Sequence, residues 1–174
     1  MSCDQIIKNS SKFAFVLIFI TSISPALSDY TELDAQAALG LVDENGHAEI
    51  PSTYTSIGAR AFFSTNLISV NIPDTVTHIG ERAFQGTQLS TIEIPSALTV
   101  IDEGAFYNTA LTSVVIPDSV TQIGNFAFSG ATSLADITLG SSVTSIGSSA
   151  FANTAITAIE LPESLTNIGA GAFL

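Results

Sequence analysis

Residues 111–128 read LTSVVIPDSVTQIGNFAF, and this pattern decides the fold because it returns along most of the chain. Ile-Pro, once replaced by Leu-Gly and once by Leu-Pro, is followed by Thr-x-Ile-Gly and then by Ala-Phe. The Phe recurs every 22 residues, with one interval of 23, at Phe62, Phe84, Phe106, Phe128, Phe151 and Phe173. A fixed period with a single insertion is typical of stacked units, because each unit must meet its neighbour in the same register. The sequence therefore predicts a repeat array whose function lies on a surface.

Each repeat supplies two extended legs. Alternation along the first leg predicts a short strand in which Val114 and Ile116 point inward and Val115 points outward. Pro117 ends that strand, because proline fixes its own φ and has no N–H for a further ladder bond. Apolar residues of the segment 120–123 then return to the core on a second short leg.

The rest of the repeat is predicted to turn the chain back. Glycine recurs after the second leg, where either a positive φ or a close backbone approach explains it, and Asp102 takes this place once. The Ala-Phe pair is expected on a tight segment of at most one helical turn, with Ala where backbones come close and Phe filling the interior. The residues two places after Phe are expected to close the coil as turn residues; they are Gly86, Asn108, Gly130 and Asn153. One coil buries too little apolar surface to offset its backbone entropy, so the coils must fold as an array.

The assembled consensus, LxxVxIPxxVTxIGxxAF, resembles the BspA-like, treponemal-type leucine-rich repeats of bacterial and protist surface proteins. The resemblance covers residues 48–173. It implies a leucine-rich-repeat solenoid, curved and right-handed, in which parallel strands stack in short coils of about 22 residues, and a role in adhesion or macromolecular binding. The family commonly has Cys three residues after the Phe, where this chain has Thr65, Thr87, Thr109, Ala131 and Thr154. This departure leaves the fold prediction intact and removes any cysteine ladder.

The first 28 residues are predicted to be a secretory signal peptide. Lys8 and Lys12 precede an unbroken apolar run at 13–20, and Pro25 precedes the small-residue segment 26–28. A retained membrane anchor is the alternative, although polar residues interrupt the run well short of the ~20 residues that a spanning helix needs. Cleavage would make the protein secreted or displayed at the cell surface.

The mature chain would be strongly acidic. The full sequence has a net charge of −12, and removing residues 1–28 leaves 2 basic residues against 15 acids, a net charge of −13. Arg60 and Arg82 alone remain basic, which disfavours nucleic acid and anionic membranes as partners. Solubility explains the acidity most simply, and attraction for cations or basic partners is the alternative. Cys3 lies in the predicted signal, so no disulfide is expected.

Three segments are therefore expected: the signal peptide 1–28, an N-terminal capping segment 29–47, and a solenoid of about six coils at 48–174. Within the cap, residues 31–39 are expected to form a short helix with Thr31 as N-cap and Asp34 in its first turn. Asn45-Gly46 predicts a hairpin. The sequence stops part-way through a coil at Leu174, which is compatible with a longer array, with a frayed last coil, or with end-to-end self-association through that coil.

The outward positions of the first leg form a candidate binding strip. Equivalent residues of stacked coils are expected ~4.8 Å apart, so they line up as ladders. The central row of the strip is Glu49, Asn71, Glu93, Val115, Thr138 and Glu160, and its flanking row is Ser69, Thr91, Ser113, Asp136 and Ala158. The strip is shallow, polar and mildly acidic, and it lacks the Tyr, Trp and Arg anchors of protein hot spots. A solvated sheet face without a ligand is the simpler interpretation.

Six threonines form a second ladder, at Thr55, Thr77, Thr99, Thr121, Thr144 and Thr166. Threonines in register could bind a regular lattice such as ice or a polysaccharide. The alternative is that they suit a strand and hydrogen-bond across it.

Catalytic, cofactor and metal chemistry find little support. His47 and His78, the two histidines, lie in different coils and are expected at a hairpin surface and at an outward strand position. The serines have no positioned base in the sequence, so they are not predicted to be nucleophiles. The acidic pairs at 43–44 and 102–103 do not offer the six or so converging oxygens that a hard cation needs. We therefore expect no enzyme activity, no cofactor and no metal site.

These observations predict a secreted or surface-displayed protein that binds or adheres to another macromolecule, an extracellular protein or a glycan. A structural spacer or surface-layer element without a specific ligand is the second hypothesis, and a lattice binder is the third. No nucleic-acid partner is expected, and no membrane association after signal cleavage.

Overall fold

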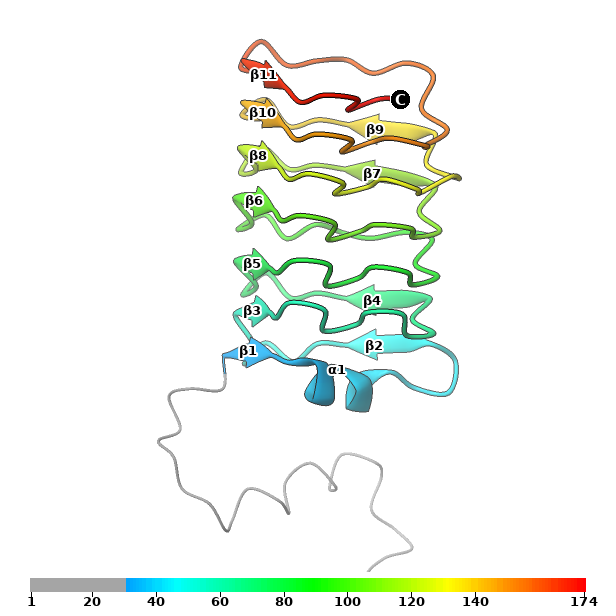
Figure 1. Cartoon of the computed structure of the whole chain (residues 1–174). Coiled ribbons are helices and arrows are strands. Elements are labelled where there is room, and N and C mark those ends of the chain that lie inside the picture. Colours follow the sequence, from blue (N-terminus) through cyan, green and yellow to red (C-terminus); the bar gives the residue numbers. More distant parts are fainter. Residues whose placement is uncertain (1–30) are drawn as a thin grey trace, which may run out of the picture. The chain divides into compact units, whose positions relative to one another are not determined.

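Residues 31–174 are described by the computed structural model, and they wind into a stack of short coils (Figure 1). First legs contribute the strands β2 (His47–Glu49), β4 (Ser69–Asn71), β7 (Ser113–Val115) and β9 (Asp136–Thr138). Second legs contribute β1 (Glu32–Leu33), β3 (Ser56–Ile57), β5 (His78–Ile79), β6 (Val100–Ile101), β8 (Gln122–Ile123), β10 (Ser145–Ile146) and β11 (Asn167–Ile168). The predicted signal peptide lies outside the described residues.

The strands pair in parallel between equivalent positions of successive coils. Ile57 of β3 pairs with Ile79 of β5, and Ile123 of β8 pairs with Ile146 of β10. The second legs form a three-stranded sheet, β1-β3-β5, and a four-stranded sheet, β11-β10-β8-β6. The first legs form two two-stranded sheets, β2-β4 and β7-β9. The prediction of a solenoid of parallel strands in coils of about 22 residues is confirmed.

Side chains alternate along the first leg as predicted. Val114 and Ile116 are buried, whereas Val115 is 65% exposed. The chain then turns at Pro117, whose carbonyl accepts a hydrogen bond from the N–H of Val120 at 3.1 Å. This turn directs the second leg back into the core.

The phenylalanines form a continuous column through the solenoid. Consecutive rings stack with centroids 5.2–5.4 Å apart and planes within 12° of parallel. The five rings from Phe62 to Phe151 are at most 1% exposed, and Phe173 in the last coil is 40% exposed. Because each ring contacts the next, the column ties every coil to its neighbours through apolar contact.

The Ala-Phe segment is a tight corner without a helical turn, which agrees with the prediction of a tight segment of at most one helical turn. Ala61 N–H and Phe63 N–H donate to carbonyls three residues back, whereas Phe62 N–H donates to Ala83 of the next coil at 2.7 Å. A helix cannot continue because left-handed φ angles recur twice in each corner. They occur before Ala, at Arg60, Arg82, Gly104, Phe126, Ser149 and Gly171, and two residues after Phe, at Ser64, Gly86, Asn108, Gly130 and Asn153. The turn role predicted for the second of these rows is confirmed.

Threonines take the place where related repeats carry Cys. The hydroxyls of Thr65, Thr87, Thr109 and Thr154 each donate to the carbonyl of the Phe three residues earlier, at 2.9–3.0 Å. Thr87 and Thr109 are buried. These hydroxyls satisfy a buried carbonyl at each corner, so the Thr row stabilises the turn.

Glycine recurs after the second leg because successive backbones approach closely there. A Cβ on Gly124 would lie 2.8 Å from the carbonyl carbon of Asp102 and 2.9 Å from the carbonyl oxygen of Ile101, closer than real side chains come. Neither Gly124 nor Asp102 has a left-handed φ. Of the two explanations weighed from the sequence, close approach is therefore right and positive φ is wrong.

The ladder of second legs is interrupted between β5 and β6. In the next coil, Thr121 N–H donates to Thr99 O at 2.8 Å and Gly124 N–H donates to Ile101 O at 2.7 Å. Among the described residues, the N–H groups of Thr99 and Asp102 make no corresponding bonds to the coil before them. Asp102 is the residue that replaces Gly in this row, and its Cβ occupies the space through which the backbones of other coils approach. The side chain therefore holds the second legs of these two coils beyond hydrogen-bonding range, while corner bonds such as Phe84 N–H to Ala105 O at 2.8 Å still join the coils.

A helix and a turn cap the N-terminal end of the described residues. Helix α1 (Ala35–Leu41), the one helix within residues 31–174, has Asp34 as its N-cap, with Asp34 Oδ1 accepting from Ala37 N–H at 2.8 Å. The prediction of Thr31 as N-cap is wrong, because Glu32–Leu33 extends the ladder of second legs by pairing with β3. The Asn45-Gly46 turn is confirmed by the antiparallel bridge between Val42 and Ala48.

Candidate functional site

The predicted strip lies on the outer side of the first legs, but it is not a continuous sheet. Strands β2, β4, β7 and β9 carry Glu49, Asn71, Val115 and Thr138 outward, and all four side chains are exposed. Thr91 with Glu93, and Ala158 with Glu160, lie on legs that form no strand. Strand pairing among the first legs is therefore confined to β2 with β4 and β7 with β9. A shallow hollow of about 300 Å³ opens where the ladder stops after β9, lined by Ile137, Thr138, Leu139, Ala158, Ile159 and Glu160.

The N-terminal end of the strip holds a small polar network. His47 Nδ1 lies 2.9 Å from Ser69 Oγ, and His47 Nε2 lies 3.9 Å from Glu49 Oε2. Asn71 Nδ2 donates to Glu49 Oε1 at 2.7 Å. We expected no base positioned beside a serine, and the contact between His47 and Ser69 corrects that expectation. The residues lie exposed on an open sheet face, where water surrounds the group, and this arrangement does not activate a serine as an enclosed site does.

The Thr ladder turns its hydroxyls toward the backbone. The hydroxyl of Thr77 donates to Thr55 O at 3.3 Å, that of Thr144 to Thr121 O at 2.9 Å, and that of Thr166 to Thr144 O at 3.0 Å. These donors are engaged in cross-coil bonds and are not offered to a ligand. The structure thus confirms that the threonines hydrogen-bond across the strands.

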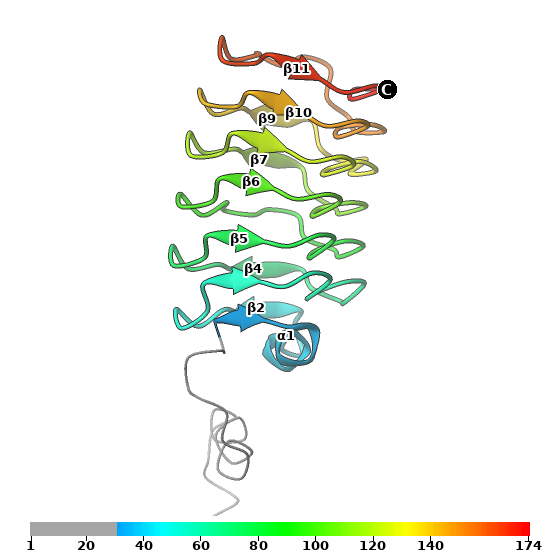
Figure 2. The ribbon, with the colours of Figure 1, turned by 60° about the vertical axis from the view of Figure 1, so that its left-hand side comes forward.

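Arginine and aromatic side chains gather on the corners instead. They occupy the two positions that flank each Ala-Phe pair, and we call the column that they form the corner ridge: Arg60, Phe63, Arg82, Gln85, Tyr107 and Phe126. Figure 2 shows the stacked corners as a narrow column at one edge of the strands. Phe63 is 42% exposed and Phe126 is 43% exposed. Arg60 lies over the Phe63 ring, with its Cζ 5.9 Å from the ring centroid.

The corner ridge was missed by the sequence analysis, which followed the strand periodicity. The sequence does mark these positions by their variation. The buried Ala-Phe pair repeats faithfully, whereas the residue before Ala changes from Arg to Gly and the residue after Phe changes from Phe to Tyr. Backbone geometry marks the same place. Arg60, Arg82 and Phe126 adopt left-handed φ angles of 55–58°, a conformation that costs a residue with a Cβ about 1–2 kcal/mol.

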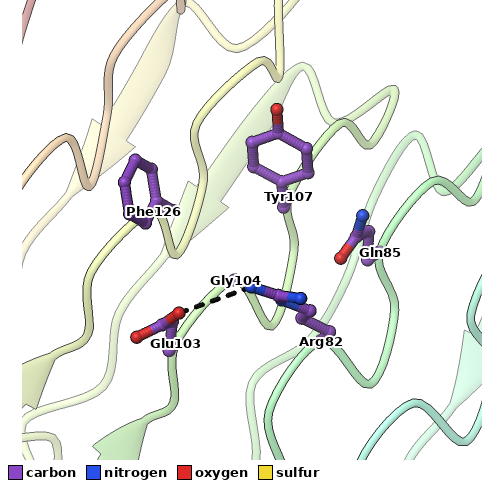
Figure 3. A pocket seen from close by; sticks show the side chains of 6 residues that line it. All are labelled: Arg82, Gln85, Glu103, Gly104, Tyr107 and Phe126. Carbon is purple, nitrogen blue, oxygen red and sulfur yellow. Dashed lines mark ion pairs between the residues drawn. The ribbon is translucent and has the colours of Figure 1, made fainter.

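A hollow of about 290 Å³ opens on the corner ridge (Figure 3). Gly104 lies on its floor, because Arg82 precedes it and Phe126 follows it in the same row of the stack, and the Arg82 side chain crosses over it. A Cβ at Gly104 would lie 3.1 Å from Arg82 Cγ. The complete lining is Arg82, Gln85, Glu103, Gly104, Tyr107 and Phe126.

Two ion pairs orient the polar side of this hollow. Arg82 Nη2 lies 3.5 Å from Glu103 Oε1, and Arg82 Nε lies 3.4 Å from Glu81 Oε1. All three side chains are partly exposed, so the pairs add little to stability but hold the guanidinium group in place. Gln85 Oε1 is buried and has no hydrogen-bond partner among the described residues. The polar side therefore offers the planar guanidinium and carboxylate groups for hydrogen bonding.

Next to the ridge, an acidic side chain is partly buried. His78 Nε2 lies 3.6 Å from Asp102 Oδ2. Burial raises the pKa of Asp102, the neighbouring His78 lowers it, and Glu81 raises it further.

Within residues 31–174, no group of three or more His, Cys, Asp or Glu side chains is placed to hold a metal ion. In that same part of the chain, no helix has the length and apolar character needed to cross a bilayer.

Comparison with known proteins agrees with this architecture. Residues 99–174 match the family model described as BspA type leucine rich repeat region (6 copies). The chain carries BspA-type leucine-rich repeats. No match was found among curated proteins.

Solved structures with the same repeats come from several bacteria. A leucine rich cell surface protein of Faecalibacterium prausnitzii A2-165 is 37% identical over 73% of the chain, with a TM-score of 0.64. Leucine-rich repeat proteins of Bacteroides ovatus ATCC 8483 and Eubacterium ventriosum ATCC 27560 are 28% and 25% identical over 71% and 73% of the chain, with TM-scores of 0.55 and 0.54. The BspA-type chain spans 35%, 39% and 44% of the three relatives' own lengths, which is less than two thirds in each case.

Proposed function

We propose that this BspA-type chain is a secreted or surface-displayed protein that binds an extracellular macromolecule, a protein or a glycan. The observation that carries the proposal is the corner ridge, where exposed aromatic rings and both arginines of the repeats gather on an otherwise acidic surface. Tyr and Arg are over-represented among the residues that dominate binding energy, and exposed apolar clusters on a soluble protein are typical of interaction sites.

The repeat architecture supports the same function. The recurring Phe, Leu, Ile and Val side chains of the repeat are mostly buried in the interior, so recognition falls to the faces and edges of the stack. Stacked repeats create extended surfaces, and binding is their usual role. The relative from F. prausnitzii is described as a cell surface protein, which supports a location outside the cell. The predicted signal peptide supports it as well.

An array experiment tests this function. The secreted protein, purified from a host that exports it, is applied to printed glycans and to printed extracellular proteins. We expect saturable binding to a small set of ligands. Binding that does not saturate, or none at all on either array, would favour the spacer hypothesis and overturn the proposal.

A matched pair of variants locates the binding surface. Phe126→Ser removes a ridge ring at a position where Ser149 occupies the same row, and Thr138→Val changes the strand face to the residue that Val115 supplies there. Both changes follow precedents within the array, so both variants should fold. Loss of binding with Phe126→Ser alone places the ligand on the ridge, and loss with Thr138→Val alone places it on the strip first predicted from the sequence.

A further inference from the structure

We infer that the hollow around Gly104 is a subsite for one sugar ring of a neutral glycan. The inference rests on the proposed binding function and names the ligand class of one site. It follows from the shape of the hollow, the division of its lining into an aromatic side and a polar side, and its local charge.

The shape of the hollow depends on Gly104, which lacks a side chain in the row of residues that precede Ala in each corner. Arg82, Gly104 and Phe126 follow one another in that row. Because Gly104 has no side chain, Arg82 lies across it, with its Cγ 3.1 Å from the place of a Cβ, and the hollow opens beside Arg82 toward Phe126 and Tyr107. Its volume of about 290 Å³ is at the lower limit of small-molecule sites in proteins, ~300 Å³. That space admits a single six-membered ring with its substituents and does not admit a folded element of a partner.

The lining has two unlike sides. Tyr107 and Phe126 supply aromatic rings on one side, and Arg82 and Glu103 supply paired polar groups on the other (Figure 3). A pyranose ring has the same division, with C–H groups on its faces and hydroxyls around its rim. The guanidinium and carboxylate groups suit bidentate hydrogen bonds with adjacent hydroxyls.

Local charge favours a neutral ligand. Arg82 is balanced by Glu103 and Glu81, with the ion pairs at 3.5 and 3.4 Å, so no unpaired cation remains at the hollow to attract an anion. A cationic ligand would have to approach the Arg82 guanidinium itself. Hydroxyls accept from the guanidinium and donate to the carboxylates without breaking either pair, which makes an uncharged polyol the best match.

The form of the ridge favours a glycan over a protein. A stable protein interface buries about 800 Å² on each partner, with a continuous apolar core. The corner ridge is a narrow column, and its exposed rings Phe63 and Phe126 lie in coils three apart. Repeated small contacts along a narrow edge suit a linear polymer of rings, which can occupy the hollow and continue along the column.

Oligosaccharide binding to the full secreted protein tests the inference. The probes are neutral β-linked glucan, mannan and galactan oligosaccharides, with polygalacturonate and chitosan as anionic and cationic probes, titrated by calorimetry at low and high salt. We expect at least one neutral probe to bind, with an affinity that salt leaves unchanged, since no charge pair forms. Gly104→Phe should abolish this binding, because the ring fills the hollow.

Two further variants and a control keep the test independent of folding. Phe126→Ser and Tyr107→Ser copy the side chains that Ser149 and Ser129 supply in the same rows, and each should weaken binding about tenfold through loss of one stacked ring. Thr112→Val, at an exposed first-leg position outside both the corner ridge and the strip, should leave the affinity unchanged. Melting curves establish that each variant is folded.

Three outcomes would overturn the inference. They are an absence of neutral-sugar binding at millimolar probe, binding of charged polysaccharides alone with steep salt dependence, and neutral-sugar binding that survives Gly104→Phe in a folded variant. If these occur while the protein array gives saturable hits, the proposed binding function stands and the glycan subsite does not.

Discussion

Replacing Asp102 by Gly should close the interrupted ladder and stabilise the protein. Asp102 occupies the row in which Gly58, Gly80 and Gly124 let successive backbones approach. Strand β6 of its own coil is not paired with β5 of the coil before. Without the Cβ, the N–H of residue 102 can reach Ile79 O and that of Thr99 can reach Thr77 O. Equivalent bonds in the next coil measure 2.7 and 2.8 Å.

The expected gain is modest but measurable. Two backbone hydrogen bonds contribute ~0.5–1.5 kcal/mol each, and the added flexibility of glycine in the unfolded chain offsets ~0.5–1 kcal/mol. The free energy of unfolding should therefore rise by roughly 1 kcal/mol, which corresponds to a melting temperature about 2–4 °C higher for a chain of this size.

Chemical denaturation measures the gain in stability, and amide hydrogen exchange measures whether the two new backbone hydrogen bonds form. The midpoint of unfolding should increase, and the amides of residues 99 and 102 should gain protection. Gly124→Asp is the reciprocal control: its Cβ would lie 2.8 Å from the Asp102 carbonyl carbon, so that junction should open and the protein should lose stability. The reasoning is refuted if Asp102→Gly adds no protection at these amides, or if Gly124→Asp is as stable as the parent.

The benefit of Asp102→Gly should grow with pH. Burial is the largest influence on Asp102, and it raises the pKa of the folded state above its ordinary value of 3.8. A carboxyl group with a raised folded pKa binds its proton more tightly in the folded state, so the parent protein loses stability as pH rises from the unfolded pKa through the folded one. The variant lacks this loss, and the difference between the two should be smallest in acid.

Three further predictions concern the core, a corner and a cross-coil clamp. Phe106→Ala should cost ~3–5 kcal/mol, because the ring is fully buried and stacked on both sides; an unchanged melting curve would mean that the Phe column is not interior. Thr109→Val should cost about 1–2 kcal/mol by leaving the Phe106 carbonyl without its 3.0 Å hydroxyl bond, with the exposed Thr112→Val as a milder control in the same denaturation series. Hydrogen bonds from the Ser141 N–H and hydroxyl lower the pKa of Asp118, so its contribution is present above the unfolded pKa of about 3.8 and lost as pH falls through the folded pKa. Denaturation midpoints measured down an acid series should fall less steeply for Asp118→Asn, and parallel curves would contradict the assignment.

Much of the coil could be predicted from one repeat. The alternation of Val114, Val115 and Ile116 requires one face to be buried, because a shift of one residue would expose the whole set. Pro117 ends the strand for a reason that depends on proline alone. The fixed Phe period places every ring at the same point of its coil, so stacking follows wherever the coils are in register.

The corner conformation could not be predicted in the same way. Glycine at 58, 80 and 124 suggested left-handed φ there, but those angles lie two residues later, at Arg60, Arg82 and Phe126. A residue type reports what a position tolerates, and glycine tolerates both a positive φ and a close neighbour. The distance to the adjacent coil, which decides between the two, depends on residues about 22 positions away.

The corner ridge could not be predicted for the same reason, because it forms only when neighbouring coils stack. Sequence periodicity leads to the strand face, because Glu49, Asn71 and Thr138 repeat with the strands. Periodicity carries no signal for a row in which Arg, Gly and Phe alternate, and the ridge appears when those side chains are stacked in space. The same holds for His47 and Ser69, which are 22 residues apart in sequence and 2.9 Å apart across two strands.

The amino-acid sequence by itself determined that the chain is an array, how long each coil is, which side chains face inward and where the strands end, because these depend on local alternation and on a strict period. Only the tertiary structure decided where coils fail to pair, which backbones touch, and that Arg82, Gly104 and Phe126 enclose a hollow. Those features are contacts between coils, and their energies depend on the distance between backbones that no single repeat specifies.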